Sequence, residues 1–140
     1  MSDLAIQLSG PVDRMGSVRA LVVDDEALIR WSVAETLVTL DIGVEQAGDA
    51  VSALDAIARA DGPFDIVVLD LRLPDVNDLT LLRKVRQLLP DAFVLLMTAF
   101  GTPEILAEAR ALGADGILSK PFALEELSEL LAQRGGPTSS

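Results

Sequence analysis

The alternation of short apolar runs with longer segments of helical periodicity constrains the fold of this chain more than any other feature. Four runs are apolar without a break, at residues 21–23, 66–69, 93–97 and 117–118. Such runs are typical of strands that are buried on both faces, as in a parallel sheet. A fifth run, at residues 44–47, alternates between apolar and polar positions and predicts an edge strand.

The segments between and after these runs have apolar residues three or four positions apart, which is typical of a helix with one buried face. These segments are 29–40, 50–57, 81–88, 105–112 and 124–131. Strands that alternate with helices predict an α/β fold of the doubly wound kind. We therefore expect a five-stranded parallel sheet with helices on both of its faces.

The two ends of the chain differ in composition from its middle part. Residues 1–17 are interrupted by glycine and proline, and they predict a flexible N-terminal extension. Residues 135–140 read Gly-Gly-Pro-Thr-Ser-Ser and predict a linker or flexible tail. We therefore expect one folded domain at residues 18–134.

Composition excludes several classes of function. The chain has no cysteine and no histidine, which excludes disulfide scaffolds, zinc fingers, Ser-His-Asp triads and thiol nucleophiles. Its formal net charge of −11 should repel nucleic-acid phosphates and anionic lipid headgroups, so we expect no direct contact with nucleic acid or membrane. No apolar stretch approaches the ~20 residues that span a bilayer, and no signal peptide is recognisable, so we expect a cytoplasmic protein.

Polar side chains follow the ends of the four strong strands. They are Asp24-Asp25-Glu26, Asp70, Thr98 and Lys120. Because ligands of such folds bind outside the carboxyl ends of the strands, we expect these groups to share one rim of the sheet. Three crowded carboxylates need a counter-charge, and Mg²⁺ suits an all-oxygen site. The pattern predicts phosphoryl transfer to Asp70 as nucleophile, aided by the metal and by Lys120.

These segments resemble the receiver domain of bacterial two-component response regulators. The resemblance extends over roughly residues 18–132 and is carried by residues 22–26, 69–74, 97–99 and 120–122. Residues Thr98–Glu104 are most similar to the enhancer-binding, nitrogen-regulator type. The resemblance implies a flavodoxin-like sheet with strand order 2-1-3-4-5.

The resemblance also implies roles for the acidic residues. Asp70 would accept a phosphoryl group from a phosphohistidine on a sensor histidine kinase. Asp25 would bind Mg²⁺ directly, and Asp24 would help either directly or through a water molecule. The backbone carbonyl of Arg72 would be a further metal ligand.

The remaining implied roles concern the switch. Lys120 would form a salt bridge with the phosphoryl group, and Thr98 would move to hydrogen-bond it, reshaping the face of the fourth helix, fifth strand and fifth helix. That face would control an effector domain or partner in transcription regulation, or support a homodimer that forms on phosphorylation. Such a domain would promote only its own phosphorylation and dephosphorylation. The Lys120–Pro121 peptide is expected to be cis.

Some positions depart from the family pattern. Asp75 and Asp78 stand where glycines are common, and since a left-handed aspartate costs about 1 kcal/mol or more, we expect a reshaped loop. Ile117 stands where the family usually has Tyr or Phe, which predicts a muted switch. Arg72 and Phe100 would border the phosphoryl group, and Phe100 would shield it from water.

Two other functions remain open from the sequence alone. One is a pseudo-receiver or scaffold that binds a partner independently of phosphorylation. The other is a phosphatase of the haloacid dehalogenase type, which also uses an aspartate nucleophile. That family needs a second aspartate two residues after the first, and this chain has Arg72 there.

Overall fold

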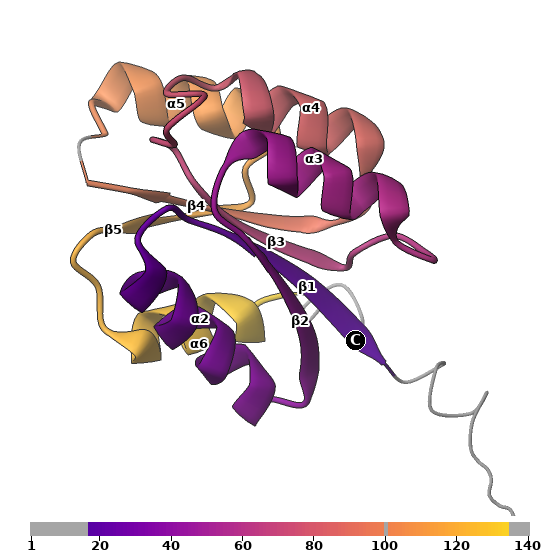
Figure 1. Cartoon of the computed structure of the whole chain (residues 1–140). Helices are drawn as coiled ribbons and strands as arrows, with labels where there is room; N and C mark the ends of the chain where they lie inside the picture. Colours follow the sequence, from indigo (N-terminus) through magenta and orange to yellow (C-terminus); the bar gives the residue numbers. More distant parts are fainter. Residues whose placement is uncertain (1–16, 100, 135–140) are drawn as a thin grey trace, which may run out of the picture.

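The computed structural model describes residues 17–99 and 101–134, in which five strands alternate with five helices (Figure 1). The elements are β1 Val18–Val23, α2 Ala27–Thr39, β2 Ile42–Ala47, α3 Ala50–Arg59, β3 Ile66–Asp70, α4 Thr80–Leu88, β4 Phe93–Thr98, α5 Pro103–Ala111, β5 Gly116–Ser119 and α6 Leu124–Ala132. The predicted tail at 135–140 and all but Ser17 of the predicted extension lie outside the described residues. In the described part, no helix is long and apolar enough to cross a membrane.

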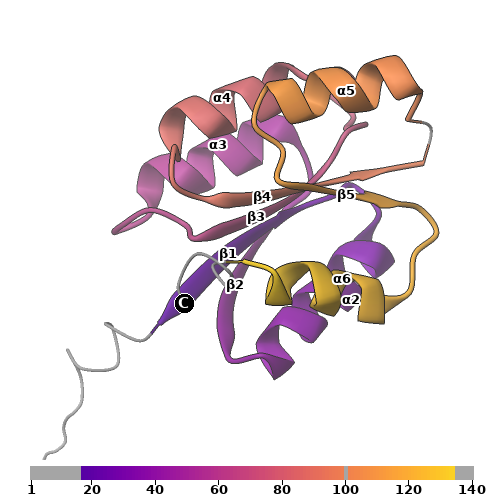
Figure 2. The same ribbon diagram turned by 180° about the vertical axis from the view of Figure 1, so that it is seen from behind.

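The five strands form one parallel sheet in the order β2-β1-β3-β4-β5. Helices α2 and α6 cover one face of this sheet and α3, α4 and α5 cover the other, as Figures 1 and 2 show from opposite sides. The doubly wound fold and the strand order predicted from the sequence are thus confirmed. The alternating run at 44–47 lies in β2, which is an edge strand as expected.

The unbroken apolar runs are explained by burial on both faces. All five residues of β3 are buried. Successive side chains of a strand point to opposite faces, so one strand supplies two separate cores. Leu21 and Val23 pack in the core under α3, α4 and α5, whereas Ala20 and Val22 pack in the core under α2 and α6.

The helix ends follow local side-chain chemistry where the sequence supplies it. Thr102 Oγ1 accepts a hydrogen bond from the Ile105 N–H, and Pro103 occupies the first turn of α5. Gly113 follows α5 with a φ of +115°, a left-handed conformation that favours glycine. The turn at Gly113 ends α5 and directs the chain into β5, which is followed by Lys120.

Candidate functional site

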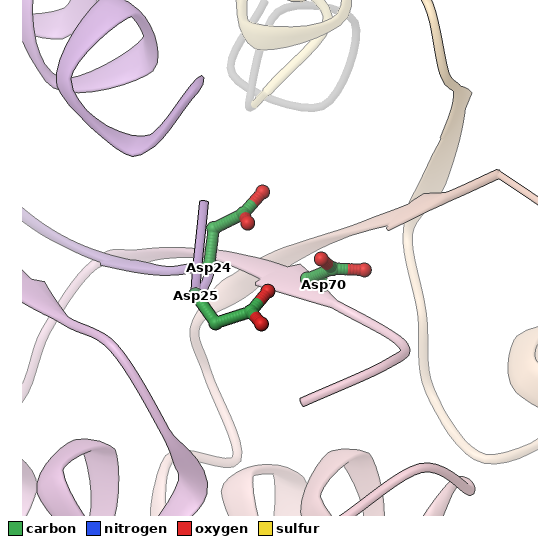
Figure 3. Close-up of side chains that lie close together, drawn as sticks. All are labelled: Asp24, Asp25 and Asp70. Carbon is green, nitrogen blue, oxygen red and sulfur yellow. The ribbon is translucent and has the colours of Figure 1, made fainter. Parts of the chain in front are cut away.

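The carboxyl ends of the strands bring the predicted acidic residues together. Asp24 and Asp25 follow β1, and Asp70 ends β3, the strand beside β1. Figure 3 shows their three side chains grouped at this rim, and one carboxylate oxygen of each lies within 4.8 Å of the others. The chain leaves β1 toward β2 on one side and resumes in β3 on the other, so the group lies at the point where the strand order reverses.

Lys120 points into this acidic group. Its Nζ atom lies 2.8 Å from Asp24 Oδ2, 3.0 Å from Asp70 Oδ2 and 3.0 Å from Glu26 Oε1. An ammonium group has three hydrogens to donate, and each has a carboxylate acceptor here. The side chain of Lys120 is only 10% exposed, so these ion pairs lie largely out of water.

Backbone contacts hold Lys120 at the rim. Its N–H donates a 2.8 Å hydrogen bond to the carbonyl of Thr98, the last residue of β4. The Lys120–Pro121 peptide is cis, as predicted. Thr98 itself is buried, and it lies one residue beyond Met97, which pairs with Asp70 across the sheet. The four predicted segments therefore meet at one end of the sheet.

Burial sets the electrostatics of Asp70. Only 7% of this residue is exposed, and burial raises the pKa of its carboxyl group above the ordinary value. Hydrogen bonds from Lys120 and from the Arg72 N–H act in the opposite direction, while the charge of Asp24 adds to the rise. The pKa of Asp70 therefore stays raised despite the ammonium group beside it.

At Lys120 the hydrogen bonds to carboxylates together affect the pKa more than burial does. Burial lowers its pKa, but the hydrogen bonds to Asp24, Glu26 and Asp70 together outweigh burial, and the pKa of Lys120 is raised. The lysine therefore carries a firm positive charge within a group that has an excess of carboxylates. A divalent cation or an anion that binds here would therefore lie beside a lysine that stays protonated at neutral pH.

An open cleft of about 470 Å³ gives access to this group. Its lining residues are Asp25, Glu26, Asp70, Arg72, Leu73, Pro74, Ala99 and Lys120. Asp24 lies below the cleft with no exposed surface, and both of its oxygens are engaged, Oδ1 by the Glu26 N–H at 2.8 Å and Oδ2 by Lys120. Asp25 is exposed to the cleft and makes no hydrogen bond or ion pair within the described part of the chain.

The loop after β3 contains the two aspartates that depart from the family pattern. Asp75 accepts hydrogen bonds from the N–H groups of Ala50 and Val51, and Asp78 accepts one from the Thr80 N–H. Neither aspartate has a positive φ; among the described residues other than glycine, only Asp41 does. The two aspartates thus avoid a left-handed backbone. That the loop differs from ordinary family geometry stays a prediction.

Two residues at the site were not assigned a role from the sequence. Glu26 is the third carboxylate partner of Lys120. In the sequence, only its position directly after Asp24-Asp25 indicated that it could lie at the site. Arg30 donates from one NH group to the Asp24 carbonyl at 2.7 Å and from Nε to Gln46 Oε1 at 3.1 Å. It ties the loop after β1 to the end of β2, a long-range contact that no local pattern indicates.

Three residues that the sequence linked to the switch or to the phosphoryl group have different outcomes. Ile117 is partly buried and packs against the core under α3, α4 and α5, so it is not on the cleft. Phe100, expected to shield a phosphoryl group, lies outside the described residues. Arg72 lines the cleft as expected from its position two residues after Asp70.

The sequence comparisons with known proteins all point to one family. Residues 20–132 match the family model described as the response regulator receiver domain. The chain is 42% identical over 111 residues to response regulator MprA of Mycobacterium bovis, covering 79% of this chain and 47% of that protein. It is 36% identical over 118 residues to response regulator protein PilR of Pseudomonas aeruginosa, covering 84% and 26%. The chain thus spans about half the length, or less, of these curated relatives.

Solved structures agree with the sequence comparison. A CheY-like receiver domain protein from Methanospirillum hungatei superposes with a TM-score of 0.78 at 28% identity, covering 84% of this chain and 93% of that one. Chemotaxis response regulator CheY4 of Vibrio cholerae superposes with a TM-score of 0.75 at 32% identity, covering 84% and 98%. The BeF3-activated DrrB receiver domain superposes with a TM-score of 0.75 at 28% identity, covering 84% and 96%.

Proposed function

The chain belongs to the response regulator receiver family of two-component signal transduction, and on this premise we propose that Asp70 is its phosphoacceptor. The observation that carries the proposal is the 3.0 Å contact between Lys120 Nζ and Asp70 Oδ2, two residues 50 positions apart in the sequence. A buried ammonium group beside a carboxylate at an open cleft suits the transfer of an anionic group to that carboxylate.

The proposed reaction is transfer from a phosphohistidine of a sensor histidine kinase. A carboxylate oxygen of Asp70 attacks phosphorus, a P–O bond forms, and the P–N bond breaks with its electron pair going to the imidazole nitrogen. Lys120 pairs with the negative charge of the phosphoryl oxygens, for which it gives up one of its three carboxylate contacts. Glu26 is the contact most easily released, because its side chain is 59% exposed.

The acidic group fits Mg²⁺. One carboxylate oxygen from each of Asp24, Asp25 and Asp70 lies within 4.8 Å of the others, and carboxylate oxygens are ligands that suit Mg²⁺. Asp25, Asp70 and the backbone carbonyl of Arg72 would hold the ion, and Asp24 would help directly or through water. The bound ion supplies positive charge that offsets the phosphoryl oxygens.

The proposed switch uses Thr98. Its hydroxyl group would move to hydrogen-bond the phosphoryl group, and the face formed by α5, β5 and α6 would change with it. We propose that this face then controls an effector domain or partner protein, or a homodimer that forms on phosphorylation. A cytoplasmic location and a single folded domain at residues 18–134 belong to the same proposal.

Receiver domains are not enzymes in the turnover sense, and we propose that this one promotes only its own phosphorylation and dephosphorylation. The test is incubation with a small acyl phosphate and Mg²⁺, followed by measurement of the intact mass. The expected result is a gain of one phosphoryl group by the wild type and none by Asp70→Asn. No gain by the wild type would favour the phosphorylation-independent scaffold, and a gain that survives Asp70→Asn would overturn the assignment of Asp70.

A further inference from the structure

Asp75 joins the loop after β3 to the start of α3. Its Oδ1 atom accepts from the Ala50 N–H at 2.9 Å and its Oδ2 atom accepts from the Val51 N–H at 3.0 Å. The two partners are 25 and 24 positions earlier in the chain. Both oxygens of one exposed carboxylate are therefore committed to a neighbouring element.

These contacts complete the capping of α3. The first four N–H groups of a helix lack partners inside the helix. Here the N–H groups of the first two helical residues bind Asp75, and the N–H of Ser52 binds the Asp49 side chain, while the Ala53 N–H makes the first regular helical bond to the Asp49 carbonyl. Asp49 is adjacent to the helix, whereas Asp75 comes from another loop, so only Asp75 ties two parts of the structure together.

The loop that Asp75 anchors forms a wall of the cleft. Arg72, Leu73 and Pro74 line the cleft, and the Leu73 N–H donates a 2.8 Å hydrogen bond to the Val76 carbonyl, which closes a tight turn that includes Asp75. At the other end of the loop, the Arg72 N–H donates to Asp70 Oδ1 at 3.2 Å. Asp75 is thus three residues from a proposed metal ligand, on a segment held at both ends.

The charge of Asp75 suits this contact. The backbone hydrogen bond from Ala50, with that from Val51, lowers the pKa of its carboxyl group, so the carboxylate is ionised at neutral pH. An ionised carboxylate at the start of a helix is also favoured by the helix dipole. The tie is therefore present under the conditions in which Mg²⁺ would bind.

We propose that Asp75 is a positioning residue, which holds the loop after β3 against α3 so that the Arg72 carbonyl is directed to the metal. This proposal rests on the proposed function, since it needs the acidic group to bind Mg²⁺. Asp75 touches neither the acidic group nor the cleft. Its effect is exerted through the backbone between Arg72 and Asp75.

The test compares Asp75→Ala with Asp49→Ala. Each variant removes side-chain capping from the same end of α3, but only Asp75→Ala releases the loop. We measure Mg²⁺ affinity by isothermal titration calorimetry, stability by thermal unfolding, and hydrogen exchange at the amides of Arg72, Leu73, Asp75 and Val76. We expect both variants to unfold at lower temperature, and only Asp75→Ala to bind Mg²⁺ about 10-fold more weakly, as for loss of a residue that orients a metal ligand, with faster exchange in the loop.

Equal weakening of Mg²⁺ binding by the two variants, or none by either, would overturn the proposal and leave Asp75 as a helix cap only. If Asp75→Ala does not fold, Asp75→Asn decides the question. It keeps one carbonyl acceptor, and we expect weaker Mg²⁺ binding than wild type; an unchanged affinity would overturn the proposal. Failure of the wild type to bind Mg²⁺ would instead overturn the proposed function.

Discussion

Glu26 Oε1 lies 3.0 Å from Lys120 Nζ, so the ammonium group at the cleft is shared between an exposed carboxylate and two buried ones. Asp24 and Asp70 contact the same nitrogen, and neither has more than 7% of its surface exposed. The three carboxylate partners of Lys120 differ in burial, and this difference predicts that the three ion pairs contribute unequally to the free energy of unfolding.

Removal of Lys120 is expected to destabilise the fold strongly. Lys120→Met would leave two buried carboxylates without their cation, and loss of one partner of a buried ion pair typically costs about 3–5 kcal/mol. Urea unfolding at neutral pH without Mg²⁺ measures this cost. The loss should shrink when the carboxyl groups are protonated in acid. Unchanged stability of Lys120→Met at neutral pH would contradict this prediction.

Loss of Glu26 is expected to have little effect on stability. Glu26→Gln removes an exposed partner, and exposed ion pairs contribute at most about 1 kcal/mol. Lys120 keeps Asp24 and Asp70, so its position should not change. The same unfolding experiment measures the variant beside Lys120→Met. A loss as large as that of Lys120→Met would show that Glu26, and not the buried pair, holds the lysine.

The raised pKa of Asp70 predicts the sign of its pH dependence. A carboxyl group whose pKa is higher in the folded state binds protons more readily when folded, so its favourable contribution is present at low pH and is lost as pH rises through the folded pKa. At neutral pH the ionised Asp70 therefore opposes folding. Asp70→Asn, measured without Mg²⁺, should therefore be more stable than wild type at neutral pH.

The measurement is the difference in unfolding free energy between Asp70→Asn and wild type across the acidic range. We expect the advantage of Asp70→Asn to grow as pH rises and to disappear at low pH. A variant that is less stable than wild type at neutral pH would show that the hydrogen bonds from Lys120 and Arg72 outweigh burial at this residue.

Mg²⁺ should stabilise the folded protein, and Asp25 should be required for the effect. A ligand that binds only the folded state at 100 times its dissociation constant adds about 2.7 kcal/mol. Asp25 is exposed at the cleft, so Asp25→Asn should fold normally but lose most of this gain. Thermal unfolding with and without Mg²⁺ tests this, with Asp61→Asn, an exposed aspartate outside the cleft, as the matched control. Equal Mg²⁺ stabilisation in both variants would remove Asp25 from the metal site.

The sequence predicted the fold and the acidic rim for one physical reason. Unbroken apolar runs identify buried parallel strands, and parallel strands deliver Asp24, Asp70, Thr98 and Lys120 to the same edge. Once the strands are located, the edge follows from topology without any knowledge of side-chain geometry.

The contacts that were not predicted are long-range bonds between side chains and backbone. Asp75 caps a helix that begins 25 residues earlier, and both Asp75 and Asp78 avoid the left-handed backbone considered for them. Arg30 donates a hydrogen bond to the Asp24 carbonyl, and Arg86 donates to the carbonyl groups of Ala92 and Gly113, which lie in two different loops. Such contacts depend on how the loops are placed after the core has formed, and loop placement leaves no periodic signal in the sequence.

Arg86 supplies the last prediction, since it stabilises the end of the sheet opposite the cleft. Its guanidinium group donates to the carbonyls of Leu89, Pro90, Ala92 and Gly113 and pairs with Asp115 at 3.0 Å. Arg86→Ala leaves these carbonyl groups without their donor, and we expect a loss of about 2–3 kcal/mol in unfolding free energy. Arg59→Ala is the control, because Arg59 forms only exposed ion pairs and its loss should cost under about 1 kcal/mol.

The same experiment separates structural from functional effects. Because Arg86 is remote from the cleft lining, folded Arg86→Ala should accept phosphate from a small acyl phosphate at the wild-type rate when measured well below its unfolding temperature. Gly113→Ala should lose stability in the same way, since a Cβ there would lie 2.7 Å from Arg86 Nε on a left-handed backbone. A stable Arg86→Ala with slowed phosphorylation would reverse this assignment and place Arg86 among the residues that act on the site.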